Sequence, residues 1–168
     1  NKHGAPGFCT QSGDALFKIY RATGDTLYAD LLRDVIHAHA EGIQPNGKIT
    51  ERLTYCDADS RGGRGDGGKT GWNETNGALM ALEIPGIYVR TDLSEVYVFD
   101  HVNAEIVKQE GQFIRLKISN PTNYDATVTI LAENQEMAQK PLGDNAFLHW
   151  TEKVKVKAGK SMLYTIRK

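Results

Sequence analysis

The hydrophobic period of the sequence changes near residue 92, and this change constrains the fold more than any other feature. Before this point apolar side chains recur at helical spacing, and after it apolar and polar residues alternate. A period of 3.6 residues is typical of helices and a period of two is typical of strands. We therefore expect an α+β protein, with helices in residues 1–92 and an antiparallel β-sandwich in residues 93–168.

Two helices are expected in the first part. The first covers Gln11–Ala22 and ends at Gly24, and Asp25 or Thr26 caps the second, which runs over residues 26–41. Because only the letters TGD join them, the two helices must be antiparallel neighbours. The predicted apolar stripes consist of Ala15, Leu16, Ile19 and Tyr20 on the first helix, and of Leu27, Leu31, Leu32, Val35 and Ile36 on the second.

A third helix and a set of strands follow. The letters NGALMALE predict a helix that Asn73 or Thr75 caps and that Pro85-Gly86 ends. Beyond Leu93 the segments EVYVFD, AEIVK, QFIRLKIS, DATVTILAE, LHWTEKVKVK and SMLYTIRK alternate and are separated by turn residues, which is typical of strands. The AGK turn between the last two segments predicts a hairpin.

The stretch GRGDGGKT, Gly63–Thr70, fits the phosphate-loop pattern letter for letter. A phosphate loop needs a buried strand before it and a parallel sheet with crossover helices around it. The letters CDADSR before Gly63 are polar, and the second part of the chain contains no helical period, so VYVFD is better interpreted as the first strand of the sandwich. Nucleotide binding through Lys69 and Thr70 is kept as an alternative because the pattern is complete.

The same segment is dense in polar side chains set among glycines. Carboxylates there could act as general acid and base, arginines could hold anionic groups, and a tryptophan offers an apolar platform for a sugar face. The other interpretation is a solvated connection whose charges pair among themselves. The residues predicted to contact substrate are Asp57, Asp59, Arg61, Arg64, Trp72 and Asn73, and those predicted to be catalytic are Asp66 and Glu74.

Composition excludes some classes of partner. The net charge of −1 argues against nucleic-acid binding, which is typical of basic chains. No apolar run approaches the ~18 residues of a membrane helix. Cys9 and Cys56 are interpreted either as two free thiols or as one disulfide. The scattered histidines predict no metal site, and no cofactor is expected.

The letters ALFKIYRATGDTLYADLLRDVIHAHAEG resemble a helical hairpin of the (α/α) toroid proteins of the six-hairpin glycosidase-like group. In that group the last helix of the ring is followed by a β-sandwich. The segment GWNETNGALMALEIPGIYV resembles the junction between helix and sandwich, and FIRLKISNPTNYDATVTILAE resembles a strand-turn-strand unit of such a sandwich. The resemblance covers most of the chain as a fold pattern and includes no complete catalytic motif. It implies hydrolase or lyase cleavage of glycosidic bonds in a cleft to which this chain contributes one wall.

The resemblance leads to our first functional hypothesis. The chain is a C-terminal fragment of a secreted or periplasmic carbohydrate-active enzyme, in which the loop over residues 57–74 lines the cleft and oligo- or polysaccharide is the ligand. The fragment is expected to be inactive alone and to dimerise through the helical surface that the rest of the ring would cover.

The alternative hypothesis is a non-catalytic glycan-binding or structural module. Aromatic side chains on one face of the sandwich would then be the anchors for the sugar, although aromatic residues in strands more often belong to a core. The candidates are Tyr97, Phe113, Tyr124, Phe147 and Trp150.

Overall fold

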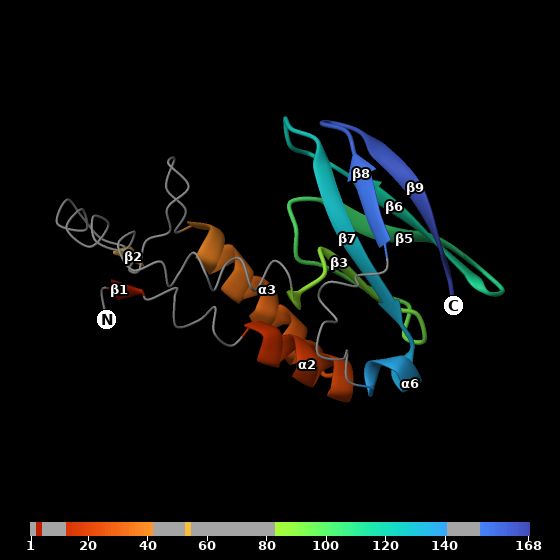
Figure 1. Cartoon of the computed structure of the whole chain (residues 1–168), viewed down its shortest axis with the longest axis horizontal. Helices are drawn as coiled ribbons and strands as arrows, with labels where there is room; N and C mark the ends of the chain where they lie inside the picture. Colours follow the sequence, from red (N-terminus) through yellow and green to blue (C-terminus); the bar gives the residue numbers. More distant parts are fainter. Residues whose placement is uncertain (1–2, 5–12, 42–52, 55–82, 141–151) are drawn as a thin grey trace. The chain divides into compact units, whose positions relative to one another are not determined.

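The computed structural model of the chain describes residues 3–4, 13–41, 53–54, 83–140 and 152–168. It contains two compact units, Asn1–Glu83 and Ile84–Lys168 (Figure 1). The first unit is helical and the second contains the sandwich, so the fold is α+β, as the sequence predicts. Among the described helices none combines the length and the apolar character that a membrane span needs.

The first unit is built around a helical hairpin. Helix α2 (Gly13–Thr23) packs against helix α3 (Thr26–Glu41), and the short strands β1 (His3–Gly4) and β2 (Leu53–Thr54) pair in antiparallel fashion. Of the predicted third helix, only its final residue, at position 83, lies within the described part of the chain. Cys9 and Cys56 lie outside it.

The turn between α2 and α3 has the structure that its letters predict. Gly24 adopts a φ of 73°, which favours glycine, and its N–H donates to the carbonyl of Tyr20 over 2.7 Å. Of the two predicted capping residues, Asp25 caps α3, because its Oδ1 accepts the N–H of Leu27 over 3.0 Å. The hairpin is therefore fixed by short-range interactions.

The buried faces of the two helices differ from the predicted stripes. On α2, Phe17 and Tyr20 are buried whereas Ile19 is exposed, and on α3, Leu32 is buried whereas Leu27 and Leu31 are exposed. The predicted stripes were right for Tyr20 and Leu32, but they left out Phe17, which brings more apolar area than the exposed Ile19 does. Ile19, Leu27 and Leu31 are thus exposed apolar side chains of this unit, and dimerisation through the helical surface stays a prediction.

The second unit is a sandwich of two sheets (Figure 1). All pairs of neighbouring strands are antiparallel except the parallel pair of β3 with β7. The four-stranded sheet has the order β4 (Glu95–Val98), β3 (Ile87–Arg90), β7 (Ala126–Glu133) and β8 (Glu152–Val156), and the three-stranded sheet has the order β5 (Asn103–Glu110), β6 (Phe113–Ser119) and β9 (Ser161–Arg167).

The core of the sandwich lies between the inner faces of the two sheets. Strand β6 shows how alternation builds it: Ile114, Leu116 and Ile118 are fully buried, and the residues between them are exposed. From the other sheet Val128 and Ile130 of β7 belong to the same cluster. One face of each strand thus makes the core, and the outer face of the three-stranded sheet carries the exposed residues.

Strand β3 was not predicted from the sequence. Its four residues are all buried and it pairs with both β4 and β7, so EVYVFD is the second strand of the sandwich and not the first. A strand that is covered on both faces shows no alternation, and its letters IYVR follow directly after Pro85-Gly86. The alternation test cannot detect such a strand.

The predicted hairpin of the last two strands is also wrong. The chain does turn at Lys157–Lys160, where Gly159 has a φ of 63° and the N–H of Lys160 donates to the carbonyl of Lys157. However, β8 pairs with β7 and β9 pairs with β6, so the turn carries the chain from one sheet to the other. Turn residues predict a reversal of the chain but not which strands hydrogen-bond.

The side chain of Asn120 anchors the connection from β6 to β7 at this end of the sandwich. Asn120 is 2% exposed. Its Nδ2 donates to the carbonyls of Tyr124 and Val156 over 2.7 and 3.1 Å, and its Oδ1 accepts from the N–H and hydroxyl of Thr122 over 2.9 and 2.7 Å. Every hydrogen-bonding position of the amide is used. Since Tyr124 precedes β7 and Val156 ends β8, Asn120 ties the connection to the turn between β8 and β9.

A carboxylate makes a second link between the same two loops. Asp125 accepts from Nζ of Lys157 over 3.0 Å and from the N–H of Ala158 over 3.1 Å, and Lys155 lies 3.4 Å away. These partners, the Lys157 hydrogen bond first, lower the pKa of Asp125 to about 2 from 3.8. This link depends on the charge of the carboxylate, whereas the Asn120 link does not.

Replacing Asn120 with alanine should destabilise the chain by about 2 to 3 kcal/mol, because the buried carbonyl of Val156 loses this donor and the part-buried bonds to Thr122 and Tyr124 are also lost. The exposed Asn123, in the same loop, is the matched control, and Asn123→Ala should change the free energy of unfolding by less than about 0.5 kcal/mol. Chemical denaturation measures both. Equal effects of the two substitutions would contradict the anchoring role of Asn120.

The contribution of Asp125 to stability should disappear in acid. Because folding lowers its pKa, the contribution is complete above the unfolded value of 3.8 and is lost as the pH falls towards about 2. Asp125→Asn should therefore be less stable than the unmodified chain at about pH 6, and the difference should shrink below about pH 4. Urea denaturation across this range measures it, with the exposed Asp34→Asn as control. A difference that is independent of pH would exclude the charge-dependent link.

Candidate functional site

The residues that the sequence singles out for catalysis and substrate binding all fall within residues 55–82, outside the described part of the chain. Their geometry, and with it the phosphate-loop alternative of Lys69 and Thr70, stays a prediction. The residues concerned are the catalytic candidates Asp66 and Glu74 and the binding candidates Asp57, Asp59, Arg61, Arg64, Trp72 and Asn73.

The aromatic anchors proposed for the sandwich have different surroundings. Phe113 is 50% exposed and Tyr124 is 53% exposed, but Tyr97 is half-buried and stacks on Phe99 with ring centroids 6.4 Å apart. Phe147 and Trp150 lie outside the described residues. Phe113 and Tyr124 are therefore the two candidates that offer a ring to solvent, and only Phe113 lies on the face of a sheet.

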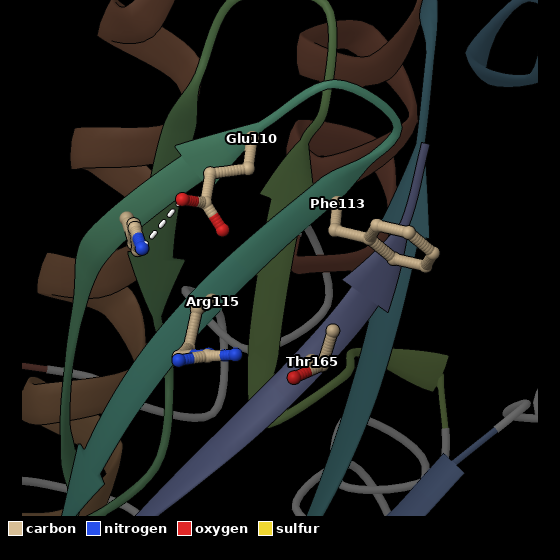
Figure 2. Close-up of a pocket in the computed structure, with 5 residues that line it drawn as sticks. Glu110, Phe113, Arg115 and Thr165 are labelled. Atoms are coloured by element: carbon tan, nitrogen blue, oxygen red, sulfur yellow. Dashed lines mark ion pairs between the residues drawn. The ribbon is translucent and has the colours of Figure 1, made fainter.

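Phe113 borders a shallow hollow of about 260 Å³ on the outer face of the three-stranded sheet. Figure 2 shows Phe113, Arg115, Glu110 and Thr165 projecting from this face, with the ion pair between Lys108 and Glu110 at one side. Strands β5, β6 and β9 all contribute. The residues that line the hollow are Lys108, Glu110, Phe113, Arg115 and Thr165.

The register of the strands places these residues in two adjacent rows. Arg115 of β6 lies between Lys108 of β5 and Thr165 of β9, and Phe113 lies between Glu110 and Arg167 in the same way. Side chains directly opposite each other in an antiparallel sheet are about 5 Å apart at Cβ, so the members of each row are neighbours. The hollow thus combines an aromatic ring, a hydroxyl group and charges of both signs.

A β-bulge in β5 makes this combination possible. The pairing passes from Ile106 opposite Leu116 to Lys108 opposite Arg115, so Val107 is an extra residue on β5, and it is exposed. If the pairing stayed regular after Ile106, Val107 would lie opposite Arg115 and Lys108 would face the core opposite Ile114, because a shift of one residue exchanges the faces of a strand. The bulge therefore brings Lys108, and Glu110 two residues further, onto the outer face.

The two carboxylates of this face are already paired. Glu110 Oε1 lies 2.5 Å from Nζ of Lys108, and Glu105 Oε1 lies 3.2 Å from Nζ of Lys117. Within the described part of the chain no carboxylate pairs with Arg115. Arg167 donates to the amide oxygen of Gln112 over 3.3 Å. The face thus presents a guanidinium group next to Phe113 with no acidic partner from the described residues.

The hollow is suited to binding and not to glycoside hydrolysis. Hydrolysis needs two carboxyl groups ~5 to ~9.5 Å apart, and Glu110 is the only carboxylate among the described residues that line the hollow. Within the described residues no group of three or more His, Cys, Asp or Glu side chains could hold a metal ion. An exposed ring beside polar groups, however, can hold a ligand that is apolar on one side and polar at its rim.

A second polar cluster lies on the four-stranded sheet, on the face that is turned away from the core of the sandwich. The buried Arg90 donates from Nε and Nη2 to the two carboxylate oxygens of Asp92 over 3.1 and 3.0 Å, and it also contacts Gln135 of helix α6 (Gln135–Ala138). The hydrogen bond from Arg90 holds the pKa of Asp92 below its usual value. Tyr88 donates to Glu133 Oε2 over 3.1 Å. These contacts link β3, β7 and α6 to one another.

The hollow was only partly foreseen in the sequence. Phe113 was among the predicted anchors, whereas Arg115, Lys108, Glu110 and Thr165 carry no motif and become neighbours only through the register of three strands. No family model matches the chain, and no curated protein or solved structure shows significant similarity to it. The fold and the hollow therefore carry the functional argument.

Proposed function

We propose that this chain is part of a carbohydrate-active protein and that its sandwich binds glycan on the outer face of β5, β6 and β9. The observation that carries the proposal is the half-exposed ring of Phe113 at the border of a hollow that is otherwise polar. The face of a pyranose ring presents C–H groups and its rim presents hydroxyl groups. A solvent-exposed phenyl ring surrounded by hydrogen-bonding side chains matches both.

The polar neighbours support a sugar over a purely apolar ligand. Thr165 and Glu110 offer oxygen atoms, and Arg115 offers several N–H donors, within one hollow around the ring. A purely apolar partner would cover Arg115 and Thr165 without offering them hydrogen bonds, and this would cost free energy. A glycan can satisfy them with its own hydroxyl groups.

The catalytic part of the proposal belongs to the glycine-rich loop. There Asp66 and Glu74 would act as general acid and base, and the sandwich would act as an accessory surface of an extracellular or periplasmic enzyme. A purely structural sandwich is the competing function, and it requires no ligand on Phe113. Binding experiments on the sandwich separate these two functions without any assumption about the loop.

Replacing Phe113 with alanine should weaken glycan binding roughly three- to tenfold, because stacking on an aromatic ring contributes about 0.5–1.5 kcal/mol. Leu163, which is 60% exposed on the same face, is the matched control, since Leu163→Ala removes apolar area without removing a ring. An array of neutral and acidic oligosaccharides identifies the ligand, and calorimetry with the best one measures the affinity.

Both substitutions lie on the solvent-exposed face of the sheet. The melting temperatures of both variants should therefore differ from that of the unmodified chain by no more than about a few degrees. If no oligosaccharide binds, or if Phe113→Ala and Leu163→Ala weaken binding equally, the proposed role of the ring is wrong and the structural function is favoured.

A further inference from the structure

We infer that the glycan bound at the hollow is acidic, and that Arg115 binds its carboxylate or sulfate group while Phe113 packs against the sugar ring that carries this group. The inference rests on the proposed function, since it specifies the class of sugar that the same surface would take. Three observations lead to it: the charge of the face, the position of Arg115 within it, and the size of the hollow.

The outer face of the three-stranded sheet carries more cations than carboxylates. Each of its two carboxylates is paired with a lysine on the same face, as described above. The two arginines therefore remain without an acidic partner among the described residues, and this local excess occurs on a chain whose net charge is −1. The cations of the face are Lys108, Arg115, Lys117 and Arg167, and the carboxylates are Glu105 and Glu110.

The position of Arg115 next to a second cation favours a nearby anion. Arg115 lies directly opposite Lys108, and like charges at opposed positions of an antiparallel pair destabilise it. Glu110 compensates Lys108, but nothing in the described part of the chain compensates Arg115 in this way. A bound carboxylate or sulfate would do so, and a planar guanidinium can hold either with two parallel hydrogen bonds.

The neighbours of Arg115 fit the same ligand. Thr165, opposite Arg115 on β9, supplies a hydroxyl group that can donate to an anionic oxygen. Phe113 is two residues before Arg115 on β6 and therefore lies on the same face. Figure 2 shows the ring, the guanidinium and the hydroxyl group at the margins of one hollow, so a ring substituent held by Arg115 and Thr165 would leave the sugar face towards Phe113.

The hollow is small. Its volume of about 260 Å³ is below the ~300–1,000 Å³ that sites for drug-sized ligands occupy. It therefore suits a single sugar unit with its charged group, and the remainder of the chain would extend over the sheet. A single-stranded nucleic acid is less suited, because it requires a series of stacking platforms along a basic groove, whereas Phe113 is the one aromatic residue among the described residues that line this hollow.

The test uses the full 168-residue chain and four tetrasaccharides: neutral cellotetraose and mannotetraose, tetragalacturonate, and a sulfated galactose tetrasaccharide without uronate. Tetragalacturonate or the sulfated sugar should bind at least about tenfold more tightly than the neutral sugars. The difference between the two acidic sugars distinguishes a carboxylate from a sulfate ligand. A thymidine oligonucleotide of similar charge is the comparison for nucleic acid.

Matched variants then assign the binding to Arg115. Arg115→Gln should lower the affinity for the acidic sugar about tenfold or more and leave neutral sugars unaffected. Lys117→Gln removes the same charge two residues away on the same strand and should have little effect, because Lys117 is held by Glu105. Glu110→Gln releases Lys108 and should raise the affinity up to about fivefold.

The possible results separate this inference from the proposed function. Equal affinity for neutral and acidic sugars, with loss on Phe113→Ala, would overturn the inference and retain the glycan-binding surface. Binding of none of the four sugars would overturn both. Equal losses in Arg115→Gln and Lys117→Gln, or tighter binding of the oligonucleotide, would replace a defined anion site with general attraction of negative charge.

Discussion

The separation of β8 and β9 into different sheets is the constraint on which the rest of the sandwich depends. Two adjacent strands joined by a short turn would ordinarily form a hairpin, and here the turn crosses the core instead. Asn120 and Asp125 hold this crossing, because both bind the turn region from the connection between β6 and β7. One link is buried and neutral and the other is exposed and charged, so the crossing combines a stable hydrogen-bonded amide with a contact that acid weakens.

The open face of the three-stranded sheet is a direct consequence of this crossing. Since β9 completes that sheet beside β6, Thr165 comes to lie opposite Arg115, and Leu163 opposite Lys117. The bulge at Val107 then turns Lys108 and Glu110 outwards on the other side of β6. A surface that combines a ring, a cation and a hydroxyl group thus arises from two features of the strands that flank β6. One is the bulge in β5, and the other is the pairing of β9 with β6 in place of β8.

Short-range patterns in the sequence predicted the local elements well. The hairpin of α2 and α3, its glycine turn and the five strands from β5 to β9 follow from periodicity and from turn residues, which act over a few positions. The buried strand Ile87–Arg90 and the partner of β9 were missed, because each depends on contacts between distant segments. The buried face of α2 was predicted only in part, because Phe17 was left out of it. The same reason applies to the hollow. Phe113 could be predicted as a ligand contact because it is aromatic, but the position of Thr165 depends on the pairing of strands that are roughly fifty residues apart in the chain.

The pairing of β9 with β6 is accordingly the central structural claim, and cross-strand NOEs in the NMR spectrum of the labelled chain measure it most directly. Contacts between the backbone protons of Arg115 and Thr165, and of Lys117 and Leu163, are expected, since these residues are opposed. No regular series of such contacts should join β8 to β9. A ladder of NOEs between β8 and β9 would show that they form a hairpin after all, and it would remove Thr165 from the hollow.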